Sequence, residues 1–165
     1  MYVEAAILTL KLALFGITFS FIVGLICSII QYLKIPILKE IIGGYIELSR
    51  NTPLLVQLFF LYFGLPRLGV MLSSELCAII GLTFLGGSYM SEAFRSGFES
   101  VERIQIESGK SIGLKPAQII RYIVLPQAIS VSVPALIANV IFLIKETSVV
   151  SAVALADLMF VAKDL

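Results

Sequence analysis

Few side chains in this sequence could take part in chemistry, because its charged residues are separated by long apolar runs. Glu92 is the most notable, since it lies in an apolar stretch with Ser88 one helical turn before it and Arg95 nearly one turn after. Ionisable groups at membrane depth are costly and usually face protein or a water-filled cavity. The Glu92 carboxylate could therefore hold an ammonium or guanidinium group. A simple ion pair with Arg95 near the membrane surface is the alternative, and both stay open here.

A second polar group, Lys145-Glu146-Thr147-Ser148, follows the last long apolar run. This group could contact a polar solute, or it could be a plain polar helix end. Asn139, in the middle of that run, suits either a helix–helix hydrogen bond or a path-lining role. We interpret Glu47 and Arg50 as interfacial charges. The candidate path residues are Ser88, Tyr89, Ser91, Glu92, Asn139, Lys145, Glu146, Thr147 and Ser148.

Several kinds of chemistry are excluded by the residues present. The chain has no histidine, which removes Ser-His-Asp and Cys-His hydrolysis and any histidine-bound metal or haem. Cys27 and Cys77 stand inside apolar stretches and fit no metal or disulfide spacing, so we expect two buried small hydrophobes. No phosphate-binding loop of the G-x-x-x-x-G-K-[ST] type is present. The basic residues form no dense run, which gives no support for nucleic-acid binding.

The composition predicts an all-α polytopic membrane protein. Of its 165 residues, 59% are hydrophobic and 14% are charged, whereas a soluble domain is roughly half apolar and about a quarter charged. A soluble fold of this size has no interior large enough for so much apolar surface. The run from Leu12 to Leu33 has no formal charge and is long enough to cross a hydrocarbon core of about 30 Å. It is followed by Pro36, which would end the first helix.

The rest of the chain predicts three further membrane helices and one interfacial stretch. The small residues of the third helix would let neighbours approach closely, so we place it inside the bundle. Asn51-Thr52-Pro53 would mark a turn or kink, and the second helix is short unless it borrows residues before Pro53 or lies partly inside protein. The last apolar stretch is too short for a confident span. In order, these segments are interfacial Ile37–Arg50, the second helix Leu54–Leu65, the third helix Leu76–Phe94, the fourth helix Tyr122–Ile144 with interruptions at Pro126 and Pro134, and the short stretch Val149–Val161.

Lysine and arginine predict the orientation, because they are enriched in cytoplasmic loops. With the N-terminus outside, three basic residues fall outside: Arg67, Lys145 and Lys163. Eight fall inside: Lys34, Lys39, Arg50, Arg95, Arg103, Lys110, Lys115 and Arg121. This balance favours an external N-terminus and a cytoplasmic segment at residues 99–126.

The cytoplasmic segment 99–126 predicts two short helices joined by a sharp turn. Gly113 suits the end of the first helix because it can take a left-handed conformation, and Pro116 suits the first turn of the next, which would run to Pro126. Glu99 and Arg103 have the spacing of a favourable ion pair. Residues at helical spacing in the first helix are Val101, Ile104, Ser108 and Ile112. A rigid surface feature of this kind is suited to fit a groove on a soluble partner.

Within this segment Glu107, Gly113, Ile123, Leu125 and Pro126 match a known signature, which reads E-A-A, three residues, G, nine residues and I-x-L-P. The signature belongs to permease subunits of bacterial ATP-binding-cassette importers, and the sequence resembles that family. Its two alanines are replaced here by Ser108 and Gly109, both of which are small. Three further stretches resemble the polar amino-acid branch: residues 49–57 (SRNTPLLVQ), 89–97 (YMSEAFRSG) and 145–151 (KETSVVS).

The resemblance implies a type I ABC-importer permease-like helix bundle, a single transmembrane domain over residues 1–165 with a coupling segment at 99–126. Family members have about five membrane helices, and the last would be truncated here. The implied protein lies in the bacterial cytoplasmic (inner) membrane and passes it several times. The segment that would couple to an ATPase subunit comprises Glu107, Ser108, Gly109, Lys110, Ser111, Ile112, Gly113, Leu114, Ile123, Leu125 and Pro126.

The resemblance also implies partners. They are an ATP-binding-cassette ATPase subunit that holds ATP and Mg, a second permease copy or homologue, an extracytoplasmic substrate-binding protein and the lipid bilayer. This chain would bind no cofactor itself and would not be an enzyme. Its substrate would be a polar amino acid, and Glu92 and Glu146 slightly favour a basic one.

Three other functions fit the sequence less well. A self-contained secondary transporter or channel would show charged groups near the midplane and inverted repeats, and no clear repeat is found. An intramembrane enzyme would need paired acids or a nucleophile with a base. A passive scaffold would not explain the two-helix cytoplasmic segment.

Overall fold

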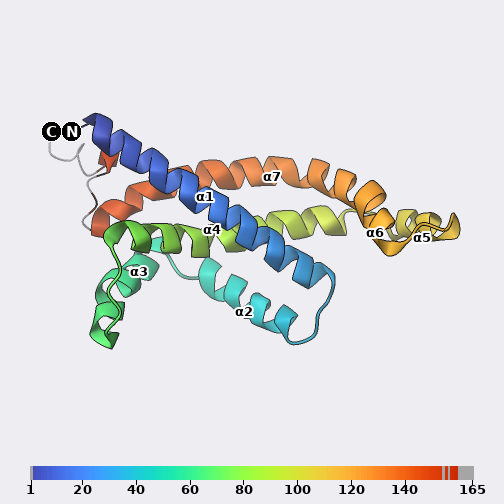
Figure 1. Cartoon of the computed structure of the whole chain (residues 1–165), viewed down its shortest axis with the longest axis horizontal. Helices are drawn as coiled ribbons and strands as arrows, with labels where there is room; N and C mark the ends of the chain where they lie inside the picture. Colours follow the sequence, from blue (N-terminus) through green and yellow to red (C-terminus); the bar gives the residue numbers. More distant parts are fainter. Residues whose placement is uncertain (1, 154, 156, 160–165) are drawn as a thin grey trace.

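Apolar runs of the sequence form the long helices seen in the described part of the chain (Figure 1). A computed structural model describes residues 2–153, 155 and 157–159. Among these residues, three helices are long and apolar enough to cross a membrane: α1 (Tyr2–Tyr32), α4 (Ser74–Glu99) and the continuous helical segment of residues 116–153 that contains α7 (Leu125–Glu146). The α1 helix begins well before the predicted Leu12, and its 31 residues would extend about 46 Å, longer than the hydrocarbon core.

The α4 helix lies at the centre of the bundle, as its small residues predict. It packs along both α1 and α7. In its most apolar stretch 61% of the residues are buried, against 33% in α1 and 17% in the segment that contains α7. Close approach explains the need for small residues: a Cβ at Gly24 of α1 would lie 2.5 Å from Met90 Cβ on α4. The Ser73 hydroxyl caps the start of α4 by accepting a hydrogen bond from Leu76 N–H at 3.3 Å.

The predicted second helix at Leu54–Leu65 corresponds to a short apolar helical segment, and the predicted interfacial stretch is a separate helix before it. The interfacial stretch forms α2 (Leu38–Arg50), and after the break at Asn51-Thr52-Pro53 the chain continues as α3 (Leu54–Phe59). A π-helical turn η1 (Phe60–Gly64) and a 3₁₀ turn η2 (Leu65–Leu68) complete a short apolar helical segment. Pro53 separates α2 from α3 because it lacks an N–H and disfavours a helical residue before it. Thus α3 borrows nothing from α2 and instead buries one side against the protein.

The predicted helix end at Pro126 is wrong. After α5 (Arg103–Ser111) and α6 (Pro116–Ile119), a π-helical stretch η3 (Ile120–Val124) leads without a break into α7. Pro126 lies in the first turn of α7, where its missing N–H is tolerated, and Pro134 lies inside that helix. A 3₁₀ turn η4 (Thr147–Val153) follows α7. The prediction of a truncated final helix concerns residues beyond the described part of the chain.

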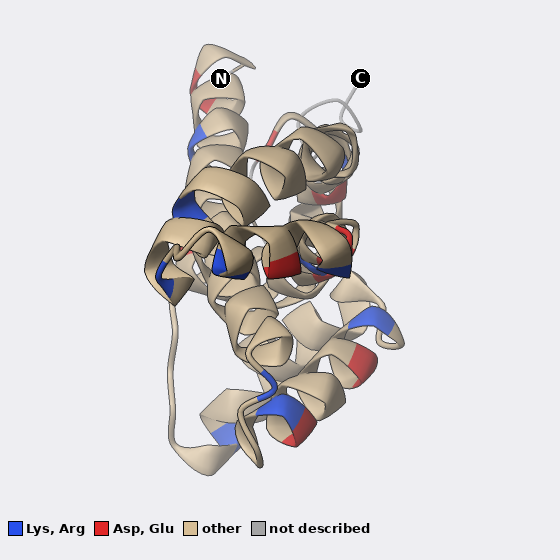
Figure 2. Ribbon diagram, turned by 90° about the vertical axis from the view of Figure 1, so that its right-hand side faces the viewer, with Lys and Arg blue, Asp and Glu red and all other residues tan. Residues whose placement is uncertain are grey.

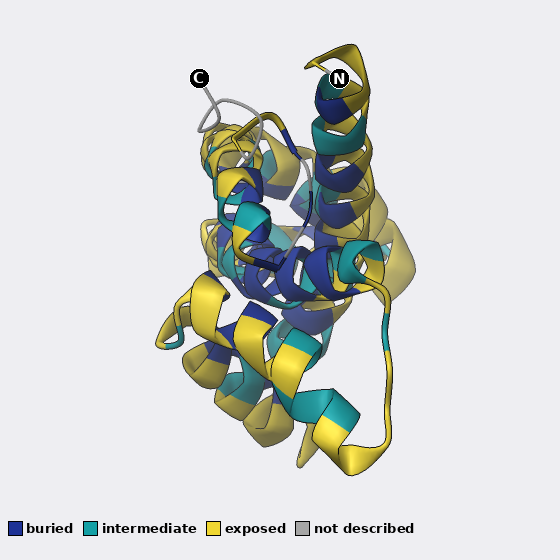
Figure 3. Ribbon diagram, turned by 90° about the vertical axis from the view of Figure 1, so that its left-hand side faces the viewer, coloured by how far each residue is buried: buried dark blue, intermediate teal, exposed yellow. Residues whose placement is uncertain are grey.

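The surface of the long helices is strongly apolar. Outward side chains such as Leu10, Leu14 and Ile26 on α1 and Ile137 and Ile141 on α7 are half or more exposed. The buried residues instead follow the line between the helices (Figure 3). Such a distribution is expected of a protein solvated by lipid.

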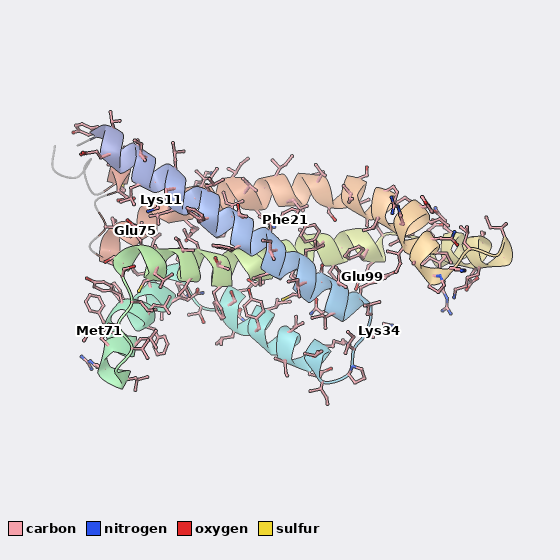
Figure 4. The ribbon with its side chains drawn as sticks, in the orientation of Figure 1. Lys11, Phe21, Lys34, Met71, Glu75 and Glu99 are labelled. Atoms are coloured by element: carbon pink, nitrogen blue, oxygen red, sulfur yellow. The ribbon has the colours of Figure 1, made fainter. Side chains whose placement is uncertain are left out.

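Charged side chains lie towards the two ends of the bundle. Lys11 and Glu75 form an ion pair of 2.6 Å near the end that carries the N-terminus (Figure 4). At the other end the chain carries α5 and α6, and Figure 2, which faces this end, shows both signs of charge on the nearest ribbons. The long apolar helices and polar ends are those of a membrane-spanning bundle, and α5 and α6 extend from one of its two ends.

Candidate functional site

The two short helices α5 and α6 project from the end of the bundle, beyond the points where α4 ends and α7 begins (Figure 1). We call α5, the turn at Gly113 and α6 the knuckle. The two helices predicted from Gly113 and Pro116 are confirmed, with Pro116 at the first position of α6. The Gln118 side chain accepts a hydrogen bond of 2.8 Å from Lys115 N–H and so fixes the start of α6.

Gly113 forms the turn of the knuckle in the left-handed conformation, with φ of +84°. Its N–H donates to Lys110 O at 2.9 Å, and Leu114 N–H donates to Gly109 O at 3.1 Å. These two bonds close the end of α5 in the Schellman arrangement. Nothing lies within 4 Å of a Cβ built on Gly113, so backbone conformation alone requires glycine there.

One face of α5 packs inward and the opposite face is exposed. A Cβ on buried Gly109 would lie 2.7 Å from Ile123 Cδ1, so the small residue permits close packing on η3. The outer face presents Ile104, which is 64% exposed, and Ile112, which is 77% exposed. Large exposed apolar side chains on an otherwise polar projection suit contact with another protein. Of the other predicted coupling residues, Glu107, Ser108, Lys110, Ser111 and Pro126 are exposed, and Leu114, Ile123 and Leu125 are half-buried.

The predicted ion pair between Glu99 and Arg103 is wrong. The Arg103 guanidinium pairs with Glu107 one turn further along α5, at 3.1 Å, and Glu99 accepts from Arg95 on α4, at 2.7 Å. The reason is that α4 ends at Glu99 and α5 begins at Arg103, so the two residues do not share a helix.

The knuckle is joined to the membrane helices by a glutamine pair. Gln127, in the first turns of α7, donates a short hydrogen bond to the Gln105 side chain on α5 and another of 2.9 Å to Ile123 O. The second bond meets a carbonyl of the π-helical stretch η3, where the regular helical pairing is displaced. Nearby, Gly97 of α4 allows α7 to approach so closely that a Cβ would overlap Ser132 Oγ. The knuckle is therefore in direct contact with α7, which itself packs closely against α4.

A charged cavity of about 710 Å³ lies beside α4 towards the same end of the molecule. Its walls come from the end of α1 and the following loop, from α2 and from α4. Two of its lining residues, Lys34 and Glu99, are marked in Figure 4. The full lining is Gln31, Lys34, Lys39, Gly43, Ile46, Glu47, Arg50, Asn51, Tyr89, Glu92, Arg95 and Glu99.

The Glu92 carboxylate in this cavity is paired with Arg95. Arg95 Nε donates to Oε1 at 3.1 Å and Arg95 Nη2 to Oε2 at 2.9 Å, so both oxygens of Glu92 are engaged. Arg95 Nη1 continues to Glu99. On the other side, Arg50 Nη1 of α2 lies 3.5 Å from Glu92 Oε2. The four side chains form a line of alternating charge from α2 to the end of α4.

Arg50 reaches this position because α2 is fastened to α4. The Tyr45 hydroxyl donates to Phe84 O at 2.7 Å, and the Ser49 hydroxyl lies 2.9 Å from the same oxygen. Burial raises the pKa of Tyr45 above its usual value, with a smaller contribution from Cys27, so the hydroxyl stays a donor. Gln57 Nε2 donates to Ser49 O and Thr52 O, which holds the end of α2 across the break.

Only Tyr89 and Glu92 of the predicted path residues line the cavity. Ser88 is buried against Ser49 of α2, with 3.1 Å between the hydroxyl oxygens. Ser91 is buried too, and its hydroxyl has no hydrogen-bond partner within the described structure. Asn139 Nδ2 donates to Tyr89 O at 3.1 Å, which is a helix–helix bond between α7 and α4.

The group from Lys145 to Ser148 lies at the far end of α7 and does not join Glu92. Thr147 and Ser148 hydroxyls donate to carbonyls of their own helix, Ile144 O and Lys145 O. The predicted path residues therefore form two separate groups in this chain. In the part of the chain that the structure describes, no cluster of Cys, Asp and Glu could hold a metal ion.

Sequence reasoning missed the polar side chains that α2 and α1 contribute to the cavity. Arg50 is the main one, because it contacts Glu92 and also lies over the Tyr89 ring, 5.1 Å from its centroid. Its position within the SRNTPLLVQ stretch was the signal that could have drawn attention to it.

Comparison with known proteins places this arrangement among transport proteins. Residues 16–164 match the family described as binding-protein-dependent transport system inner membrane component. The chain is 38% identical over 156 residues to the probable glutamine ABC transporter permease protein GlnP of Bacillus subtilis (strain 168), covering 94% of this chain and 72% of that protein. It is also 38% identical over 154 residues to the probable amino-acid ABC transporter permease protein PatM of Vibrio harveyi, covering 92% and 69%.

A solved structure agrees with these relatives. The crystal structure of an amino acid ABC transporter with histidines superposes with a TM-score of 0.90 and 33% identity, over 99% of this chain and 76% of the other. An inward-facing MetNI methionine ABC transporter shares the fold, with a TM-score of 0.81 and 21% identity, over 99% of this chain and 79% of that chain.

Proposed function

We propose that the knuckle of this chain docks on a separate ATP-hydrolysing subunit. The chain belongs to the family of binding-protein-dependent transport system inner membrane components and is a permease subunit of an amino-acid ABC transporter. The observation that carries the proposal is the knuckle itself, which projects from the bundle and turns at a left-handed Gly113. Its exposed Ile104 and Ile112 offer apolar contacts to a groove. We assign residues 1–165 to one transmembrane domain, with the coupling segment at 99–126.

In this proposal ATP and Mg²⁺ bind the partner subunit, and this chain supplies the path and the gate. Closure of two ATPase subunits would draw two knuckles together, one from this chain and one from a second copy or a homologue. Gln127 and the close contact at Gly97 would pass the movement to α7 and α4. The ATPase can shift the gate only by its differential affinity for the two states of the permease. A binding protein outside the membrane would deliver the substrate.

We propose a polar amino acid as the substrate, and the charged cavity beside Glu92 as part of its path. Names of relatives mention glutamine and amino acids. A basic amino acid is the finer proposal, and it rests on Glu146 alone, because Arg95 engages both carboxylate oxygens of Glu92. A self-contained secondary transporter or channel is not favoured, because the relatives are ABC transporter permeases.

Reconstitution tests the coupling. Proteoliposomes would contain the chain, its ATPase subunit and its binding protein, and amino-acid-stimulated ATP hydrolysis is expected only when all three are present. A cysteine in place of Ile112 should cross-link to the ATPase subunit, whereas one in place of exposed Met71 should not. Amino-acid flux driven by an ion gradient without the ATPase would refute the proposal.

We further propose that the N-terminus lies outside. The end that carries the knuckle is the more basic one, with Lys34, Lys39, Arg103, Lys110 and Lys115, while Lys11, Arg67 and Lys145 belong to the other. Single cysteines at Met71, which is 85% exposed, and at Ile112 can be labelled with a membrane-impermeant maleimide in intact cells. Native Cys27 and Cys77 are buried and give a low background. Labelling is expected at Met71→Cys alone, and labelling at Ile112→Cys alone would reverse the orientation.

A further inference from the structure

Arg50 is the cation of the charged cavity that lies beside Glu92 and still has unused hydrogen-bond donors. Its Nη1 lies 3.5 Å from Glu92 Oε2, longer than the range of about 2.7–3.2 Å for an N–H···O hydrogen bond. Within the described residues, no hydrogen bond from its guanidinium is found, although the group carries several N–H donors. Its side chain is 42% exposed. Arg50 is therefore available to a ligand in a way that Arg95 is not.

Glu92 is the opposite case, because Arg95 already engages both of its oxygens. A cationic ligand group would have to displace two charge-assisted hydrogen bonds to reach this carboxylate. The cavity as a whole also carries more positive than negative groups. Its lining has four cations (Lys34, Lys39, Arg50, Arg95) against three carboxylates (Glu47, Glu92, Glu99), a formal net charge of +1. The charge in this cavity favours an anionic ligand group.

The Tyr89 ring orients the Arg50 guanidinium. The Arg50 Cζ atom lies 5.1 Å from the ring centroid, within the range of a cation–π contact. Tyr89 is itself held against Phe142 of α7, with ring centroids 5.1 Å apart. A guanidinium whose plane is oriented in this way loses less freedom when it binds a carboxylate through two parallel hydrogen bonds.

We propose that Arg50 binds the α-carboxylate of the amino-acid substrate, an inference that rests on the proposed function. Asn51 follows Arg50 in the lining of the same cavity and adds an amide donor. The cavity, of about 710 Å³, has the size of a small-molecule site. Because every α-amino acid has this carboxylate, Arg50 would bind α-amino acids as a class. Other residues would then distinguish one substrate side chain from another.

The test compares amino acids with amines that lack only the carboxylate. The wild-type permease–ATPase complex in detergent is titrated calorimetrically with L-glutamine and 4-aminobutanamide, and with L-arginine and agmatine. The wild type should bind the amino acid of at least one pair more tightly than its amine. Arg50→Ala should weaken binding of that amino acid roughly 10- to 100-fold and leave the amine unchanged, as expected for lost hydrogen bonds to a charged group. Arg50→Lys should lie between them, because it keeps the charge and loses the fork.

Lys39→Ala is the matched control, since it removes a cation from the same cavity that, in the described structure, forms no ion pair with Glu92 and no cation–π contact with Tyr89. If it weakens amino-acid binding as much as Arg50→Ala does, net charge explains the effect and the proposal is overturned. The proposal is also overturned if Arg50→Ala keeps the wild-type preference for the amino acid. Thermal unfolding of each variant is measured in parallel, and Arg50→Gln, which has a shorter neutral side chain and still carries N–H donors, carries the test if Arg50→Ala does not fold.

Failure of the proposed function has a different result. In that case no protein amino acid stimulates ATP hydrolysis by the wild-type reconstituted system, and both proposals fall together. Normal stimulation with an unaltered Arg50→Ala variant overturns the Arg50 proposal alone.

Discussion

Replacing Gly113 by valine should uncouple transport without preventing membrane insertion. The φ of +84° at Gly113 is a conformation that costs an L-residue about 1–2 kcal/mol, and a β-branched residue is the least tolerant of it. Since nothing lies within 4 Å of the position, the cost is conformational and not steric. A cost of about 1.4 kcal/mol reduces the population of the native turn relative to alternatives by about tenfold. Amino-acid-stimulated ATP hydrolysis should fall by up to this factor.

Gly69 offers a closely matched control at the other end of the molecule. Its φ is +85°, nothing lies within 4 Å of its Cβ position, and its turn is closed by the same two bonds, from Gly69 N–H to Pro66 O and from Val70 N–H to Leu65 O, both 3.1 Å. Gly69→Val should therefore cost the same conformational energy but leave coupling intact. Gly113→Asn should keep most of the activity, because asparagine enters the left-handed region more readily.

Two measurements check this prediction. Stimulated ATP hydrolysis in proteoliposomes reports coupling, and a thiol-reactive dye reports thermal unfolding through buried Cys27 and Cys77, which is useful because the chain has no tryptophan. Normal transport by Gly113→Val would refute the reasoning. Equal uncoupling by Gly69→Val would show that a strained turn anywhere in the chain has the same effect.

Two further substitutions test the connection between the knuckle and the bundle. Gly97→Ala would place a Cβ onto Ser132 and should lower the free energy of unfolding by about 1–3 kcal/mol in the dye assay. The control Gly44→Ala, whose Cβ would have nothing within 4 Å, should raise the free energy of unfolding by about 0.5–1 kcal/mol. Equal effects of the two substitutions would contradict the close packing of α4 and α7. Gln127→Leu leaves Gln105 without its partner and should cost about 0.5–1.5 kcal/mol together with part of the coupling. The Gln105→Leu/Gln127→Leu double variant should recover stability but not coupling, and a double variant less stable than the single one would count against the glutamine pair.

Much of the fold could be predicted from runs of apolar residues. Because charged groups are excluded from lipid, the charge-free run from Leu12 and the small residues of α4 predicted a membrane helix and its interior neighbour. An error occurred at a proline. The break at Pro53 is confirmed, whereas Pro126, predicted to end a helix, lies in the first turn of α7, where its missing N–H is tolerated.

The candidate site also has a part that the sequence predicts and a part that it does not. The knuckle could be predicted because its turn depends on residues close together in the chain, with Gly113 ending one helix and Pro116 starting the next. The pairing of Glu99 could not, because it depends on where α4 ends. The sequence alone predicts an interfacial charge at Arg50, because the SRNTPLLVQ stretch that contains it does not indicate that α2 folds back onto α4.

The sequence by itself determined that the chain crosses a membrane, that it has a turn at Gly113, and that it resembles importer permeases. These features follow from local backbone preferences and from the cost of charge in lipid, both of which act between residues near one another in the chain. Only the tertiary structure decided that Arg50 and Tyr89 share a cavity with Glu92 and that Lys145 does not. Hydrogen bonds from Tyr45 and Ser49 to Phe84 bring α2 against α4, and contacts between residues so distant in sequence exist only after the helices have packed.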